Sequence, residues 1–327
     1  MSGQDFFANH RQVTTPSGHI SYVERGNGPV ALFVHGVLLN GYLWRHQLAE
    51  LSDVRRCIAV DLMAHGKTEI SATQDVSVTA NAHMLAQFLD ALHIDQVDLV
   101  GNDSGGGICQ IFAALYPKRV RSLVLTNCDA HDNWPPEAFK GFVGMVAAGG
   151  LGRTLNAMLG DKSIYRSPQA LGLAYERPEA VSDDTIETYV RPHVCSPQRT
   201  HDLERFVNAF DCRHTVAIES ALRQLPVPTL IAWGTDDIFF DVKWSHWLEK
   251  TILGAKRRVE FTDARIFFPE ERAGEFNNEV RAHWVATAEN RIDGATAANG
   301  SPTISTKPLL RSQQETRVGL QYRIDGK

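Results

Sequence analysis

The chain has 327 residues, a formal net charge of −5, and 43% hydrophobic and 22% charged residues. This length suffices for one large α/β domain or two small domains with a sizeable core, and the composition lies far from that of disordered chains. The slight negative charge and the lack of any Lys and Arg cluster argue against binding to nucleic acid or to an anionic membrane.

Short apolar strands and helices alternate in the first 130 residues. This alternation predicts βαβ units and a mainly parallel sheet that is buried on both faces. The predicted elements are an antiparallel strand pair turning at residues 16–18, strands over 30–36, 58–62, 97–101 and 122–127, and helices over 80–92 and 104–116.

After these elements the pattern changes. The segment 135–222 is helical in character, contains Gly and Met residues, and has no convincing strand. Strand character returns over 228–234 and 258–263. We therefore predict a sheet domain, residues 1–134 and 223–290, interrupted by a helical cap.

The chain ends and the cysteines indicate where the protein works. Residues 291–327 are rich in small and polar residues, and we expect a poorly ordered tail. The N-terminus lacks the charged start and apolar run of a secretory signal, and no apolar stretch of about 18 residues occurs. The five cysteines are widely spaced without a CxxC pair. The sequence thus predicts a soluble, cytoplasmic protein with reduced cysteines.

The most informative stretch is LVGNDSGGGICQ, where a strand ends at Gly101 and a helix follows at once. Gly101 and Gly105 bracket Asp103 two positions away on either side. This pattern is typical of a nucleophile elbow, a sharp turn that lifts the central side chain to the top of the sheet. Ser104 at the apex would need a small residue where Asn102 stands, so Asp103 is the favoured nucleophile. The alternative is a glycine-rich turn with Asp103 as helix N-cap.

With this elbow the chain resembles the α/β-hydrolase fold, an α/β architecture with a mostly parallel sheet of eight-stranded type flanked by helices. Within that fold it resembles the aspartate-nucleophile branch of haloalkane dehalogenases and epoxide hydrolases. The resemblance covers roughly residues 10–285 and is strongest in FVHGVLLNGYLWRHQLAEL, RRCIAVDLMAHGKTE, the elbow, SLVLTNC and DNWP.

The resemblance implies an oxyanion hole near the elbow. The HG after the third strand begins the corresponding loop, so His35, Gly36 and the backbone amide of Val37 map onto it. The amide of Ser104 is the expected second donor, since backbone N–H groups need no particular side chain. Trp134, in DNWP, is a candidate substrate-binding residue.

The resemblance also implies a triad acid after the seventh or the sixth strand. Asp237, in WGTDD, matches the first position, and Asp129, in TNCDAHDNW, is the alternative. Loop capping and surface solvation are the non-catalytic interpretations of these carboxylates.

The sequence departs from both relatives at the groups that assist the leaving atom. Dehalogenases bind halide with an Asn and a Trp at the positions of Val37 and Ser104, so dehalogenation is not expected. Leu38 replaces the Pro of the epoxide hydrolase loop. Three tyrosines fall in the helical segment with no spacing that marks them as proton donors: Tyr165, Tyr175 and Tyr189.

A third departure removes the general base. The chain reads FTDARIFFPEERAGEFN where the family has D-A-G-H-F, which puts Ile266 at the catalytic His. Attack by a carboxylate needs no base, but hydrolysis of the resulting ester does. His131 and His65, in loops at strand ends that face the site, are candidates for a relocated base, with exposed loop histidines as the alternative. His193 is assigned to the surface of the cap.

Two functions remain open. The first is a hydrolase-type enzyme acting on a small, largely apolar substrate between cap and sheet. Asp103 would be the nucleophile or an acid/base, Asp237 or Asp129 would support it, and the amides of Val37 and Ser104 would be the oxyanion donors. The second is a non-hydrolytic lyase, isomerase or cyclase, or a binding protein that has lost the base. We expect no metal and no organic cofactor, because the sequence shows no ligand cluster and no GxGxxG spacing.

Overall fold

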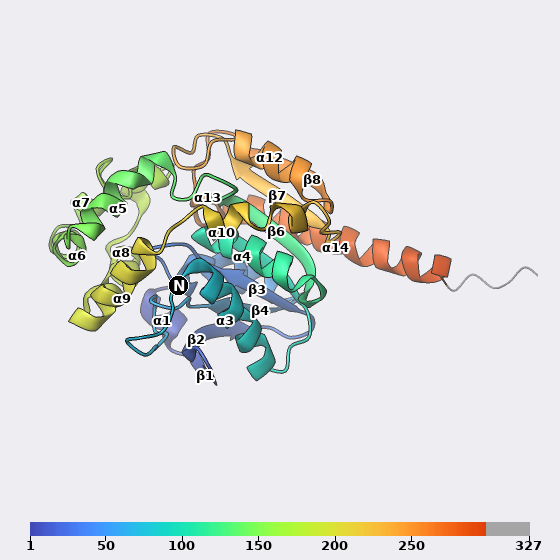
Figure 1. Cartoon of the computed structure of the whole chain (residues 1–327), viewed down its shortest axis with the longest axis horizontal. Helices are drawn as coiled ribbons and strands as arrows, with labels where there is room; N and C mark the ends of the chain where they lie inside the picture. The colour runs from blue at the N-terminus through green and yellow to red at the C-terminus, as the bar shows by residue number, and fades with distance from the viewer. Residues whose placement is uncertain (299–327) are drawn as a thin grey trace, which may run out of the picture. The chain divides into compact units, whose positions relative to one another are not determined.

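The computed structural model describes residues 1–298, in which eight strands form one sheet flanked by helices (Figure 1). The strand order is β1-β2-β4-β3-β5-β6-β7-β8; β1 and β2 pair antiparallel, as do β2 and β4, and the other pairs are parallel. The predicted fold class is therefore confirmed. The strands are β1 (Arg11–Thr15), β2 (Gly18–Arg25), β3 (Val30–Val34), β4 (Arg56–Val60), β5 (Val97–Asp103), β6 (Val120–Cys128), β7 (Thr229–Gly234) and β8 (Ala255–Phe261).

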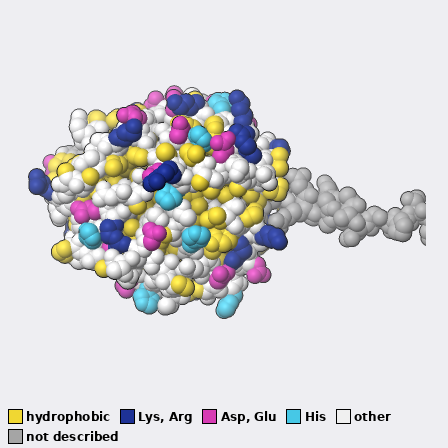
Figure 2. Space-filling model, in the orientation of Figure 1, with side chains coloured by type: hydrophobic (Ala, Val, Ile, Leu, Met, Phe, Trp, Pro, Cys, Tyr) yellow, Lys and Arg dark blue, Asp and Glu magenta, His cyan; other side chains and the backbone are white. Residues whose placement is uncertain are grey.

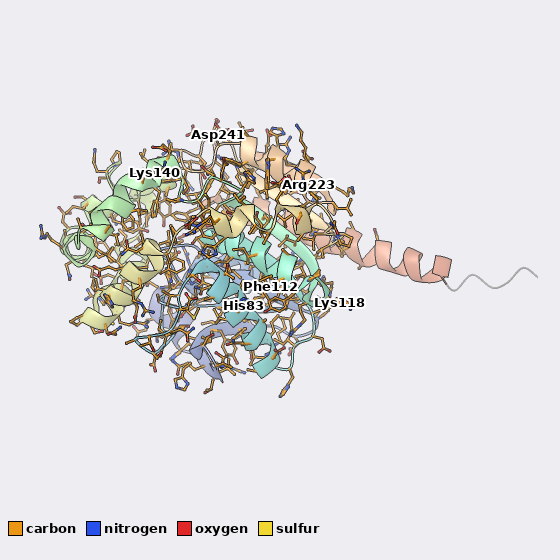
Figure 3. The ribbon with its side chains drawn as sticks, viewed as in Figure 1. His83, Phe112, Lys118, Lys140, Arg223 and Asp241 are labelled. Atoms are coloured by element: carbon orange, nitrogen blue, oxygen red, sulfur yellow. The ribbon has the colours of Figure 1, made fainter. Side chains whose placement is uncertain are left out.

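The central strands are continuous apolar runs because helices cover both faces of the sheet. Every residue of β3, β5 and β7 is buried. Helices α3 (Val78–Ala91) and α4 (Ser104–Leu115) pack against each other, and Figure 3 shows His83 of α3 and Phe112 of α4 in this region. The His83 imidazole bonds the Tyr116 hydroxyl at 2.7 Å, just after α4.

A helical segment separates β6 from β7 in the chain, and no strand occurs between Cys128 and Thr229. Figure 1 shows α5 to α9 gathered beside the sheet. We call residues 135–222 the insertion. Its helices are α5 (Lys140–Ala147), α6 (Leu151–Gly160), α7 (Lys162–Arg166), α8 (Asp183–Val194), α9 (Pro197–Asn208), α10 (Arg213–Val216) and α11 (Glu219–Leu222).

The remaining helices lie near the chain ends and after β3 and β7. They are α1 (Gly3–Phe7), α2 (Arg45–Leu51), α12 (Lys243–Thr251), α13 (Phe268–Glu271) and α14 (Ala273–Ala298). The predicted tail begins at residue 291, within α14, which continues to Ala298. The rest of that predicted tail, 299–327, lies outside the described residues.

The surface carries both signs of charge. Figure 2 shows basic and acidic side chains interspersed among apolar ones on the face in view. Within residues 1–298, no helix combines the length and the apolar character that crossing a bilayer would demand.

Candidate active site

Asp103 stands at a sharp turn between β5 and α4. It is the last residue of β5, and α4 begins at the next residue. Its φ of 56° and ψ of −136° lie where non-glycine residues are strained by about 1–3 kcal/mol. The turn also needs Gly105, since a Cβ there would lie 2.2 Å from the carbonyl oxygen of His35. The geometry is that of the elbow expected from the sequence.

Two backbone amides bind the Asp103 carboxylate. The Val37 N–H donates to Oδ2 at 2.9 Å, and the Ser104 N–H also bonds the carboxylate. These are the donors that the sequence assigns to the oxyanion hole. Gly36 permits this approach, because a Cβ at that position would lie 2.0 Å from Oδ2.

A cavity of about 30 Å³ lies beside Asp103. Asp103 and Asp129 are its two polar side chains, and the lining is otherwise apolar. Apolar members of the lining include Phe139, Leu171, Phe210, Phe239, Ile266 and Phe267. The space holds little more than a water or two, so an organic ligand must displace side chains to enter.

A second cavity, of about 480 Å³, adjoins the first. The two share Leu38, Phe139, Leu171 and Phe239, so these four side chains separate them. Most of the larger cavity is lined by residues of the insertion, with Met145 and Met158 among them. It offers an apolar route toward Asp103.

The carboxyl groups of the small cavity titrate abnormally. Burial raises the pKa of Asp103 to about 7, the amides of Ser104 and Val37 oppose the shift, and the charge of Asp237 adds to it. Burial, followed by the charge of Asp103, raises the pKa of Asp129 well above its usual range. Two carboxyl groups in one apolar cavity cannot both ionise easily, so the pair retains a proton near neutral pH.

Asp237 lies behind the cavity rather than in its lining. Its Oδ1 accepts N–H bonds from Phe239 at 2.8 Å and Phe240 at 3.3 Å, and its Oδ2 accepts one from Asn127 Nδ2 at 2.8 Å. Burial raises its pKa to about 7, against the effect of these bonds. Asp237 therefore caps its own loop and influences Asp103 through charge.

Ile266, which the sequence prediction puts in place of the base, lines the small cavity. Its side chain is buried and lines the cavity, and its carbonyl oxygen accepts a bond from Asn102 Nδ2 at 2.8 Å. No imidazole among residues 1–289 hydrogen-bonds to Asp103. The structure brings an apolar side chain, not a base, to this place.

Neither candidate for a relocated base lies in the cavity, so both hypotheses are corrected. The His131 ring nitrogens lie 3.1 Å from Glu219 Oε2 and 3.3 Å from Asp132 Oδ1, and the ring packs against Trp247. His65 is fully buried, where its Nδ1 bonds the Met63 carbonyl at 2.9 Å. Burial lowers its pKa to about 4.

His35 and His193 pack on either side of His65, with ring centroids 5.2 and 5.3 Å from it. The His35 Nε2 accepts the Leu62 N–H at 3.0 Å, and its Nδ1 donates to the Gly36 carbonyl at 2.8 Å. His35 thus fixes the loop that carries the Val37 amide. The surface assignment of His193 is wrong, because its side chain is buried against the other two rings.

Trp134 also lies outside the small cavity, which corrects its assignment to substrate binding. Its indole ring packs over Gly107 of α4, where a Cβ would lie 2.5 Å from Cζ3. The ring centroid is 5.7 Å from that of Phe210. Trp134 therefore packs the insertion against α4.

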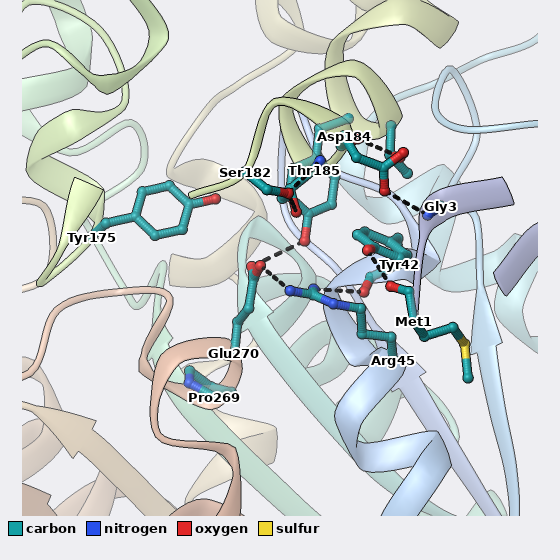
Figure 4. Close-up of polar contacts among 12 residues, drawn as sticks. Met1, Gly3, Tyr42, Arg45, Tyr175, Ser182, Asp184, Thr185, Pro269 and Glu270 are labelled. Carbon is teal, nitrogen blue, oxygen red and sulfur yellow. Dashed lines mark hydrogen bonds and ion pairs between the residues drawn. The ribbon is translucent and has the colours of Figure 1, made fainter. Parts of the chain in front are cut away.

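The three tyrosines of the insertion lie outside the small cavity. Tyr189 belongs to a polar network with Glu270 and Arg45, and Figure 4 shows Glu270 paired with Arg45. The Tyr189 hydroxyl donates to Glu270 Oε2 at 3.0 Å, and the hydroxyls of Tyr165 and Tyr175 lie 3.1 Å apart. Arg45 Nη2 pairs with Glu270 Oε1 at 2.7 Å. This network joins the insertion to α2 and α13.

Residues 29–272 match the family described as alpha/beta hydrolase fold, and this range covers β3 to β8, the elbow and the insertion. The chain belongs to the α/β-hydrolase fold family. Epoxide hydrolase 4 of Mus musculus is 24% identical over 237 residues, 69% of this chain and 64% of that protein. Haloalkane dehalogenase 2 of Mycobacterium bovis is 34% identical over 110 residues, 34% of this chain and 38% of that protein.

Solved structures of other proteins share the fold of this α/β-hydrolase. The epoxide hydrolase CorEH without ligand has a TM-score of 0.70 at 19% identity, covering 85% of this chain and 99% of that one. A meta-cleavage product hydrolase from Pseudomonas fluorescens has a TM-score of 0.67 at 21% identity, covering 84% and 97%. The relationship supports a hydrolase-type enzyme, while identities this low show the fold alone.

Proposed function

We propose that this α/β-hydrolase acts on a small, largely apolar electrophile, with Asp103 as the nucleophile. The observation that carries the proposal is the binding of the Asp103 carboxylate by the Val37 and Ser104 amides at a strained turn beside an apolar cavity. The Val37 amide binds Oδ2, and we assign the attack on carbon to Oδ1. The amides can then stabilise the oxyanion that forms on the ester carbonyl.

The substrate would reach Asp103 from the larger cavity after displacement of the side chains shared by the two cavities. The apolar lining favours a substrate with little polarity away from its reactive carbon. The names of the relatives, epoxide hydrolase and haloalkane dehalogenase, fit attack on an electrophilic carbon.

Trapping of Asp103 tests the proposal. A short primary alkyl bromide should place one alkyl group on the peptide that contains Asp103, as seen by peptide mass mapping. Hydroxylamine should remove it, because an aspartyl ester is cleaved by this reagent and a thioether on the exposed Cys195 is not. Asp103→Asn should carry no such adduct.

A second candidate function is a lyase, isomerase, cyclase or binding protein without an ester intermediate. Ile266 at the position of the base favours it. An unmodified Asp103 after exposure to both alkyl bromides and epoxides would put this candidate first.

A further inference from the structure

A second carboxyl group shares the cavity with the proposed nucleophile. Asp103 pairs in register with Cys128 at the end of β6, so Asp129 follows directly on the neighbouring strand. Both carboxyl groups line the cavity. Asp129 is 1% exposed, and its Oδ1 has no hydrogen-bond partner among the described residues. Burying an oxygen without a hydrogen-bond partner costs free energy of folding, so we expect this oxygen to carry a proton or to take part in the reaction.

The shared proton belongs on Asp129. No Lys or Arg side chain lines the cavity to balance two negative charges. Asp103 accepts N–H bonds from Val37 and Ser104, which stabilise its charged form. Asp129 lacks partners of that kind for Oδ1, and burial together with the charge of Asp103 raises its pKa. At neutral pH the site therefore contains a carboxylate beside a carboxylic acid.

We propose that Asp129 is the general acid and then the general base of the site, and that the substrate is an electrophile whose leaving atom is a basic oxygen. The proposal rests on the nucleophilic role of Asp103. A departing halide would need N–H donors, and no lining side chain provides one. An oxygen released by ring opening needs a proton instead, and a neutral carboxyl group beside the nucleophile supplies it.

The first step can be written for an epoxide. The free Asp103 oxygen forms a bond to a ring carbon, and the bond between that carbon and the ring oxygen breaks. The ring oxygen takes the proton of Asp129. The products are a hydroxyalkyl ester on Asp103 and a carboxylate on Asp129.

The second step uses the carboxylate that the first has created. Asp129 takes a proton from water, and the hydroxide adds to the ester carbonyl, whose oxyanion the Val37 and Ser104 amides bind. The alcohol leaves and takes the proton of the new Asp103 carboxyl group. The diol departs, and the pair returns to one carboxylate and one acid without an imidazole.

This mechanism separates two classes of electrophile. Bromide leaves an alkyl bromide with its electron pair and takes no proton. Burial, the larger cause of the raised pKa of Asp129, remains after Asp103 is esterified, so Asp129 keeps its proton and cannot activate water. The alkyl ester should therefore persist. An epoxide draws the proton from Asp129 and should be turned over.

The test uses styrene oxide and a short alkyl bromide with the full chain. The wild type should form many diols per chain from styrene oxide but only one ester from the bromide. Asp129→Asn should lower diol formation by a factor of about 100 or more, the usual contribution of general acid–base catalysis. It should keep the labelling by bromide, which shows that the variant is folded. Asp95→Asn, exposed at the other end of β5, is the matched control and should keep diol formation.

Two outcomes would overturn the role of Asp129. One is a wild type that forms a single ester from styrene oxide and no diol, and the other is an Asp129→Asn variant with wild-type diol formation. Both would leave Asp103 as the nucleophile. Absence of any adduct or product with either reagent would instead refute the proposed function itself.

Discussion

Replacing Asp103 by Asn should stabilise the protein, and the gain should grow with pH. Burial raises the pKa of Asp103 to about 7 in the folded chain, whereas an Asp in an unfolded chain titrates near about 3.9. Between these values the folded chain binds a proton that the unfolded chain lacks. The free energy of unfolding of the wild type therefore falls as pH rises through this window, and an Asn escapes that loss.

The magnitude follows from the width of the window. Each pH unit between the two pKa values costs the wild type about 1.4 kcal/mol. From about pH 5 to about pH 7, the advantage of Asp103→Asn should increase by about 3 kcal/mol and then level off. Asp103→Asn also removes the negative charge that raises the pKa of Asp129, which adds to the gain in the free energy of unfolding as pH rises.

Urea unfolding followed by tryptophan fluorescence, at about pH 5, 6, 7 and 8, measures this dependence. The wild type is compared with Asp103→Asn and with Asp95→Asn, whose carboxyl group is exposed. We expect the control to follow the wild type at every pH. An advantage of Asp103→Asn that stays constant over this range would refute the argument that this buried carboxyl group, with no cation beside it, titrates near neutral pH.

Three further predictions concern the alkyl ester on Asp103. Its rate of formation should rise about tenfold between about pH 6 and 8, because the carboxylate attacks and the acid does not; a flat pH profile of initial labelling rates would contradict this. Gly36→Ala should abolish labelling while the circular dichroism spectrum is kept, since a Cβ there would lie 2.0 Å from Asp103 Oδ2; retained labelling would be inconsistent with that contact. Ile266→His should convert the stable ester into one that hydrolyses slowly in mass-spectrometric time courses, with Ile266→Leu as control, because an imidazole would then face the cavity; an equally stable ester in both variants would count against it.

The fold could be predicted because its signals are local. Strands such as β5 and β7 are continuous apolar runs, and their alternation with helices leaves few sheet arrangements open. The elbow was visible for the same reason, since Gly105 must be glycine where the turn passes the carbonyl of His35. Composition alone does not mark where a helix stops, and α14 runs past residue 291.

The rest of the site depends on contacts between distant segments. His131 and Trp134 follow β6 as expected. Contacts with α11 and α12 hold His131 away from the cavity, and packing on α4 holds Trp134 away from it. His193 is buried because α8 packs against the loop that carries His65. The place of Asp129 after a strand makes it a candidate from sequence, whereas its position next to Asp103 follows from the register of β5 and β6.

Counting bromide ions is the most direct test of Asp103 as a nucleophile in a site without an imidazole beside it. Wild-type protein with its cysteines blocked is mixed with excess short alkyl bromide, and released bromide is measured against time and against alkylated Asp103. We predict one bromide per chain, matched by one ester, and then no further release. Continued release of bromide would contradict the account, because it would mean that the site activates water to hydrolyse the alkyl ester. If neither bromide nor ester forms, Asp103 does not attack.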